Sequence, residues 1–484
     1  MSETEKTTIK ILIYTDNPEI SPNNSAGDLF GVGSMLERLK AHAPTFATID
    51  PKWVSRNSDA QHPADHKLDT ILKSEEFDEI WFFGLHQANT KRFSLRDRQG
   101  GPESELSQSE IDALTEWMKV RADGCGGGGI LMAGDHSSEP PGVTVDPDTR
   151  CNQDTSTFLG LGRALGRSVP RAGLLRRWEG PPSNCDKDSF STIFNFGFQL
   201  DDKPQHLELR NVNADGDPDP NGQPHPLFFY KQGQFIQVFP DHPHEGAVII
   251  PTAPLDPAVW PALNGKQPGP HVVAFGRDVR RGEALNIIAT YNGDLAGVGR
   301  IVADSTWHHY MNVNLTSFPH PAPVGSESDQ IGQFYANLAV WLAPQCKRQK
   351  MAGAMLHQLA LYDAFMECDS NLERTGARAH SVMAKIASPT EIHEFWQSTP
   401  REYANFFAAN EGVTELPSRN QLLGSLVKNY QSAVFNVGPA TADATAVNIE
   451  NVFVAGFENA FSQHAEQLQK TLAVLSSVKL QKKA

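Results

Sequence analysis

Residues 106–136, LSQSEIDALTEWMKVRADGCGGGGILMAGDH, carry the pattern that decides the fold. Ser107 and Glu110 have the spacing of a capping box, in which each side chain satisfies a free backbone N–H at the start of a helix. Apolar residues then recur at helical spacing until a run of glycines ends the helix. The apolar run 129–136 is typical of a buried strand, and it ends in an aspartate and a histidine. The stretch therefore predicts a helix that leads directly into a strand.

The same succession of strands and helices extends to both sides of this stretch. Strand-like apolar runs lie at 7–16, 45–50, 77–87 and 299–305, and an amphipathic helix is expected over 25–42. The strand runs are continuously apolar, which is typical of strands covered on both faces. We therefore predict an α/β fold with an open, doubly wound, mostly parallel sheet of the flavodoxin-like kind.

Shifts in composition divide the chain. Residues 1–345 are expected to form the α/β domain. Within it, residues 140–245 are rich in Pro, Gly, Asn and Asp, which predicts an insertion of loops and small antiparallel strands. Residues 346–484 are helix-like throughout and predict a C-terminal all-α domain. Its long last helix can pack on its own domain or against another subunit, so a homo-oligomer held by the C-terminal helices is one expectation.

Composition and charge exclude several classes of protein. The chain has 484 residues and a net charge of -15, which disfavours a broad nucleic-acid-binding surface. Its apolar runs are too short to cross a membrane, and its N-terminus lacks the pattern of a secretion signal. The five cysteines are widely spaced without a Cys-x-x-Cys pair, which indicates reduced thiols. We therefore expect a cytoplasmic protein that binds neither nucleic acid nor membranes.

Polar residues gather where the predicted strands end. Parallel sheets bind ligands beyond the carboxyl ends of their strands, near the point where the strand order reverses. The candidate residues at these ends are Asp16, His86, Asp135, His136, Asp304, Trp307, His308 and His309. If the topology is right, these residues lie along one edge of one sheet and form a polar site.

Two chemistries suit this group. Imidazoles and carboxylates can bind zinc, manganese or iron and leave a position open for water, which the metal turns into a nucleophile. Without a metal, a His–Asp pair can act as an oriented general base. We assign His136 and His308 as ligands or bases and Asp135 and Asp304 as the residues that orient them. The substrate-binding residues are expected to be Asp16, His86, Trp307 and His309.

A second cluster of potential ligands lies in the segment PDHPHEG, residues 240–246. In an extended segment His242 and His244 point to the same face, which is acceptable spacing for two ligands of one metal. Glu245 is a third candidate ligand. The alternative is that Pro243 marks only a turn.

Several segments together resemble the class I glutamine amidotransferase-like superfamily, in its trehalose-utilisation (ThuA-like) branch. They are KILIYTD, FDEIWFFG, LSQSEIDALTEWMKVRADGCGGGGILMAGDHSS and GVGRIVADSTWHH, followed by a helix at 329–343. The resemblance covers residues 8–345. Amidotransferases of this class place a nucleophilic cysteine after the strand that here ends in MAGDHSS, and no cysteine stands there. Cys125 precedes that strand, so glutamine hydrolysis is not expected.

The sequence thus favours a hydrolase-like protein that acts on a small polar substrate, and the resemblance adds the suggestion of a carbohydrate-like one. Whether a divalent metal assists is left open. The alternative is a non-catalytic sensor or scaffold, in which a superfamily domain without its cysteine is combined with a helical tail that binds a partner or another copy of the chain.

Overall fold

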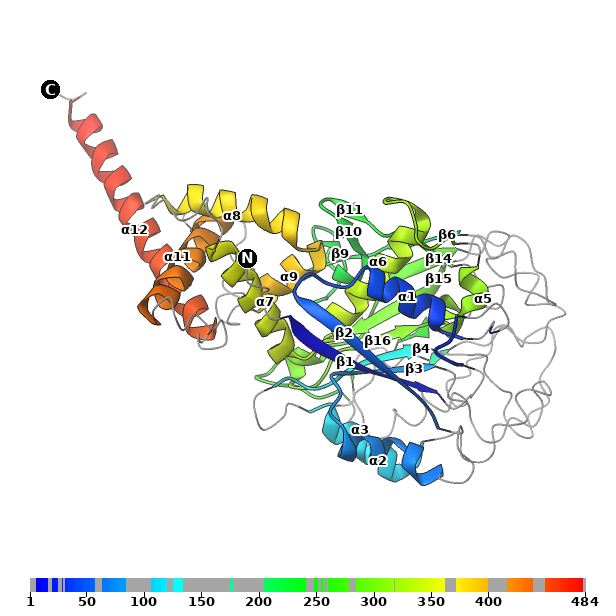
Figure 1. The fold of residues 1–484 in the computed structure, drawn as a ribbon. Helices are drawn as coiled ribbons and strands as arrows, with labels where there is room; N and C mark the ends of the chain where they lie inside the picture. Colours follow the sequence, from blue (N-terminus) through cyan, green and yellow to red (C-terminus); the bar gives the residue numbers. More distant parts are fainter. Residues whose placement is uncertain are drawn as a thin grey trace. The chain divides into compact units, whose positions relative to one another are not determined.

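Figure 1 shows the computed structural model of the chain. The structure describes residues 6–15, 20–24, 28, 31–56, 63–83, 106–119, 125–133, 175–176, 204–240, 248–250, 254–255, 257, 260–277, 284–316, 318–361, 371–398, 416–437 and 449–481. The chain divides into two compact units. One comprises residues 8–43 and 48–347, and the other comprises residues 1–7, 44–47 and 348–484.

The larger unit is an α/β structure built on an 8-stranded sheet of order β2-β1-β3-β4-β16-β15-β14-β7. The strands are β1 (Thr7–Thr15), β2 (Ala47–Ser55), β3 (Glu79–Phe83), β4 (Gly129–Ala133), β7 (Glu208–Leu209), β14 (His271–Arg277), β15 (Ala284–Tyr291) and β16 (Ile301–Asp304). Strands β1, β3, β4 and β16 are parallel to one another. Strands β15, β14 and β7 continue the sheet in antiparallel fashion. The predicted α/β class is confirmed.

The central strands are buried on both faces, as their continuous hydrophobicity predicts. Every residue of β3, β4 and β16 is buried. Helices lie on both sides of the sheet: α2 (Leu68–Ser74) and α3 (Gln108–Trp117) on one, α1 (Gly33–Ala41) and α6 (Glu327–Leu342) on the other (Figure 1). Such double coverage is why these strands lack the alternation of half-exposed strands.

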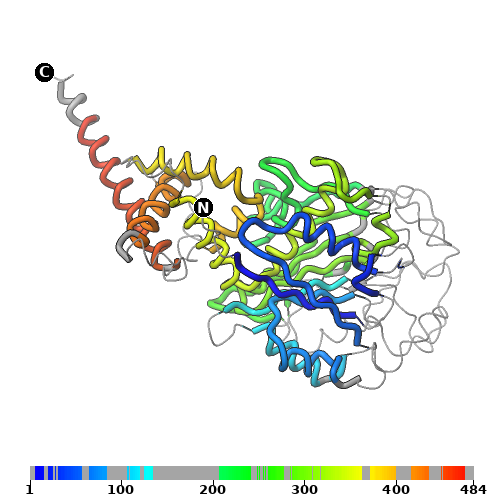
Figure 2. The backbone as a smooth tube through the Cα atoms, viewed as in Figure 1, coloured from blue at the N-terminus to red at the C-terminus, as the bar shows by residue number. Residues whose placement is uncertain are grey.

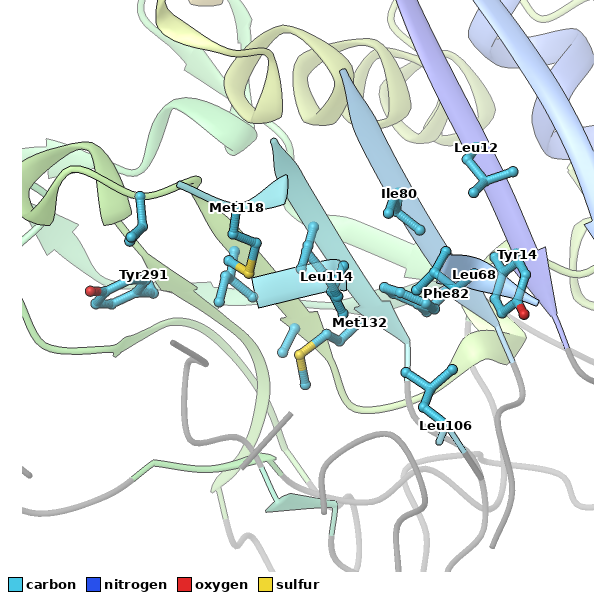
Figure 3. Packing of buried hydrophobic residues seen from close by; sticks show 14 of the residues in the cluster. Leu12, Tyr14, Leu68, Ile80, Phe82, Leu106, Leu114, Met118, Met132 and Tyr291 are labelled. Atoms are coloured by element: carbon cyan, nitrogen blue, oxygen red, sulfur yellow. The ribbon is translucent and has the colours of Figure 1, made fainter. Parts of the chain in front are cut away.

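The core beneath α2 and α3 joins alternate residues of the parallel strands to the helices. Figure 3 shows Ile80 and Phe82 of β3 and Met132 of β4 beside Leu114 and Met118 of α3. Helix α3 begins as the sequence predicts, because the Ser107 and Glu110 side chains form the full capping box. Glu110 also forms a buried ion pair with Arg56, whose Nη2 lies 2.7 Å from its Oε2.

The glycine run before β4 allows the backbone to pass close to the ends of α3 and α6. A Cβ on Gly127 would lie 1.7 Å from the carbonyl oxygen of Met118, and one on Gly129 would lie 2.1 Å from that of Leu342. Any side chain at these two positions would therefore force backbone apart. The run lets the chain pass between α3 and the end of α6 before it enters the sheet.

Next to this run, Cys125 and Cys346 form a disulfide, with their Cα atoms 4.8 Å apart. The prediction of reduced thiols is therefore wrong for these two cysteines. The two residues are 221 positions apart in the sequence, so no local spacing indicates the pair. They meet because the segment before β4 packs against the end of α6, where α7 (Gln345–Ala360) begins.

Small antiparallel pairs lie in, and directly after, the described part of residues 140–245, the range of the predicted insertion. They are β12 (Val238–Pro240) with β6 (Pro204–His206), β10 (Phe229–Lys231) with β11 (Gln234–Phe235), β8 (Asn211–Val212) with β9 (Gln223–Pro224), and β13 (Val248–Ile249) with β5 (Leu175–Arg176). One strand of this range, β7, also forms the edge of the main sheet.

The second unit is mainly helical. Its helices include α8 (Leu372–Ile386), α9 (Pro389–Gln397), α11 (Arg419–Val437) and α12 (Ile449–Gln481), together with most of α7. Helix α11 packs on both α8 and α12. Among the described helices of the chain, none combines the length and the apolar character that a membrane span requires.

Candidate functional site

The parallel strands end in register. Thr15 at the end of β1 is the partner of Phe83, Phe83 is the partner of Ala133, and Ala133 is the partner of Asp304. These four terminal residues form one row across the sheet. The segments that follow them consequently leave the sheet along a single edge, where parallel α/β proteins bind their ligands.

Most of the predicted site residues lie outside the part of the chain that the structure describes. These are Asp16, His86, Asp135, His136, His242, His244 and Glu245. The backbone of His308 belongs to the short 3-10 helix η7 (Trp307–Tyr310), whereas its side chain is not among those described. The geometry of the site is therefore built from Asp304 and its surroundings.

Asp304 is the last residue of β16 and is 2% exposed. Its Oδ1 accepts hydrogen bonds from His309 Nδ1 at 2.8 Å and from the backbone N of Thr306 at 3.2 Å. Its Oδ2 accepts a hydrogen bond from the Tyr310 hydroxyl at 3.0 Å. Three donors thus compensate for the removal of this carboxylate from water.

His309 is held in one orientation by these contacts. Its bond to Asp304 makes Nδ1 the protonated nitrogen, so Nε2 is the ring atom that can accept a proton. The ring packs edge-to-face against Phe239 with centroids 5.1 Å apart, and the Tyr335 hydroxyl donates to the His309 carbonyl oxygen at 2.7 Å. The residue is only 1% exposed, so its position is fixed by packing as well as by hydrogen bonds.

Tyr310 donates its hydrogen bond to the second oxygen of the same carboxylate, Asp304 Oδ2. Its ring lies 5.2 Å from that of Phe83, the last residue of β3, and 5.6 Å from that of Tyr335. Burial, and then the nearby charge of Asp304, raise the pKa of Tyr310 well above its ordinary value. The hydroxyl therefore stays protonated and remains a donor at any physiological pH.

Asp304, Trp307 and His309 were predicted as site residues, whereas the two tyrosines that complete the network were not. Trp307 is 5% exposed and lies in η7 between Asp304 and His309. Tyr310 is the residue directly after the two histidines, so the pattern Asp-x-x-Trp-His-His-Tyr contained a signal for it. Tyr335 lies in α6, and only the fold brings it to the site.

A second His–Asp pair lies elsewhere in the same unit. His42 Nε2 lies 3.0 Å from Asp329 Oδ1, and His42 Nδ1 lies 2.9 Å from the Arg38 carbonyl oxygen. Both ring nitrogens of His42 therefore face oxygen acceptors. The hydroxyl of Tyr230 also donates to Asp329.

No three His, Cys, Asp or Glu side chains come together as metal ligands among the residues that the structure describes. At the end of β16 the described residues form an oriented imidazole backed by a carboxylate, an arrangement that suits a general base. The chain matches no protein-family model, no curated protein and no solved structure. Function is consequently argued from the geometry of this site.

Proposed function

We propose that the protein is a hydrolase-like enzyme in which His309, oriented by Asp304, acts as the general base. In this proposal Asp304 holds Nδ1 and keeps Nε2 as the proton acceptor, and Tyr310 holds Asp304. The observation that carries the proposal is the 2.8 Å bond between His309 Nδ1 and Asp304 Oδ1 at the end of a parallel strand. The polar residues expected after the neighbouring strands would supply the contacts to a small polar substrate.

We also propose that the α/β unit belongs to the flavodoxin-like arrangement and to the ThuA-like branch of the amidotransferase-like superfamily. The order β2-β1-β3-β4-β16 and the four aligned strand ends support this assignment. The motifs that resemble the branch fall on β1, β3, α3 with β4, and β16. This assignment favours a carbohydrate-like substrate over the other small polar compounds.

Chemical modification tests the role of His309 without knowledge of the substrate. Diethyl pyrocarbonate acylates neutral imidazole nitrogens that it can reach, and peptide mass analysis locates each adduct. We expect His309 to react in the folded protein, more slowly than the exposed His206. Reaction of His309 only after unfolding would count against its role as a base.

Turnover provides the second test. The protein is assayed against nitrophenyl esters, glycosides and phosphates, and the active class is then measured with His309→Gln. We expect kcat to fall by about 10²–10⁴-fold, the usual contribution of a positioned base. His42→Gln is the matched control because it removes a histidine from another His–Asp pair of the same unit. Equal loss in both variants would indicate damage to the fold rather than to the chemistry.

A second candidate function rests on burial. Asp304, His309 and Tyr310 are each at most 2% exposed, and in this second candidate function the network does no more than fix η7 on the sheet. The unit would then be a non-catalytic sensor or scaffold. This alternative predicts that the wild-type chain hydrolyses none of the substrate classes and that His309→Gln lowers the melting temperature without any other effect.

A further inference from the structure

The last helix of the chain, α12, extends beyond the end of α11, the helix on which it packs among the described residues. In α12, Gly456 packs closely on Leu426 of α11, and Asn459 Nδ2 donates to Asn429 Oδ1 at 2.9 Å. Further along, Gln421 Nε2 donates to Gln467 Oε1 at 3.3 Å. Between the two hydrogen bonds, the partner on α11 moves back from Asn429 to Gln421 as α12 advances from Asn459 to Gln467, so the two helices are antiparallel.

Helix α11 begins at Arg419, close to the level of Gln467, whereas α12 continues to Gln481. Figures 1 and 2 show α12 extending past the start of α11. In this extension Leu472 is 63% exposed and Val474 is 61% exposed. Burying Leu472 against another helix would stabilise the extension.

The sequence of the extension has the spacing of a coiled coil. Its apolar stripe is Phe461, Ala465, Leu468, Leu472 and Leu475, with intervals that alternate between four and three residues. This is the a/d repeat by which two helices pack knobs into holes. The positions that would flank such a seam around Leu472 are Gln469 and Thr471, both uncharged, so no like charges oppose pairing of two identical helices.

The charges of α12 and the residues after it are segregated by sign. The acidic residues are Glu450, Glu458 and Glu466, and the basic residues are Lys470, Lys479, Lys482 and Lys483. A parallel pair of these helices would align like charges. An antiparallel pair sets the acidic part of one copy beside the basic part of the other, and it also opposes the two helix dipoles.

We propose that the extension of α12 pairs with the same segment of a second copy of the chain, as a short antiparallel coiled coil. The seam places Leu468 of one copy in a layer with Leu472 of the other. Few layers are involved, so the dimer is weak and reversible. Paired charges outside the seam make it sensitive to salt.

Sedimentation of the full-length chain over a range of concentrations tests the proposal. We expect monomers to give way to dimers in the micromolar range, with weaker association at about 500 mM salt than at about 50 mM. Leu472→Asp is expected to weaken the dimer at least tenfold because it places a carboxylate in the seam. Ala473→Asp adds the same charge to the neighbouring position outside the stripe and should leave most of the association intact.

Cysteine cross-linking tests the orientation. Leu468→Cys and Leu472→Cys are prepared as separate variants, oxidised alone and as a mixture, and the linked peptides are identified by mass. The antiparallel register predicts that a disulfide between the two variants forms mainly in the mixture. Efficient linking of each variant with itself would indicate a parallel pair and overturn the proposed orientation. A wild-type chain that stays monomeric, or a dimer that Leu472→Asp leaves unchanged, would overturn the proposal as a whole.

Discussion

Arg56→Met is expected to destabilise the α/β unit by about 3–5 kcal/mol at neutral pH, the usual cost of leaving one partner of a buried ion pair alone. Arg56 follows β2 and is 4% exposed, and Glu110 in the first turn of α3 is fully buried. The guanidinium donates from Nε to Oε1 at 3.2 Å and from Nη2 to Oε2 at 2.7 Å. Methionine retains much of the side-chain volume, so the loss reports mainly on the carboxylate that is left behind.

The loss of stability in Arg56→Met should depend on pH. Burial alone would raise the pKa of Glu110, but the hydrogen bond from the Ser107 backbone and the charge of Arg56 outweigh it, and the pKa lies below its ordinary value. A lowered folded-state pKa stabilises the protein above the unfolded pKa of about 4.3, and the contribution disappears as the pH falls through the folded pKa. The difference in unfolding free energy between wild type and Arg56→Met should therefore have its full value above about pH 6 and become smaller below about pH 4.

Urea unfolding followed by circular dichroism measures the effect, with Lys119→Met as the matched control. Lys119 pairs with Glu116 on the exposed side of the same helix region, where both side chains are more than half exposed. Such surface pairs contribute about 0–1 kcal/mol. A loss below about 1 kcal/mol for Arg56→Met, or one that does not change with pH, would refute the reasoning that Glu110 is a buried, ionised group.

Three other substitutions are each expected to lower the stability of the protein. Gly127→Ala should lower the melting temperature strongly or prevent folding, because its Cβ would lie 1.7 Å from the Met118 carbonyl oxygen; calorimetry measures the shift. Cys346→Ser removes a cross-link between residues 221 positions apart, and the loss of stability on urea unfolding should reach at most about 5 kcal/mol, the value expected if the disulfide acts on the unfolded chain. Tyr310→Phe removes the donor to Asp304 Oδ2, and unfolding should show a loss of about 1.5–3 kcal/mol, the usual value of a hydrogen bond to a charged group.

Local features of the fold were predictable where they depend on near neighbours. The capping box at Ser107 and Glu110 is a contact between residues three apart, and the structure forms it as expected. The strand that ends at Asp304 was predicted from its continuous apolar run, and all of its residues are buried. The sequence could not show that Arg56 joins this capping box, because that contact spans 54 residues.

The Cys125–Cys346 disulfide and the role of Tyr335 were not predictable for the same reason. Each depends on which elements the fold places together. The disulfide needs the segment before β4 to lie against the end of α6, and the Tyr335 contact needs the middle of α6 to lie over η7. The spacing of cysteines or tyrosines in the sequence contains no information about either arrangement.

The row of Thr15, Phe83, Ala133 and Asp304 links the fold to the proposed chemistry. A buried carboxylate such as Asp304 is costly, and it must be compensated by donors that a purely apolar anchor would not need. Apolar residues of similar volume often hold a loop as well as a buried polar pair does, or better. Asp304 is the one residue of this row that carries a carboxylate, and it forms hydrogen bonds with His309 and Tyr310. A reaction that uses the imidazole explains this set more easily than the anchoring of η7 alone.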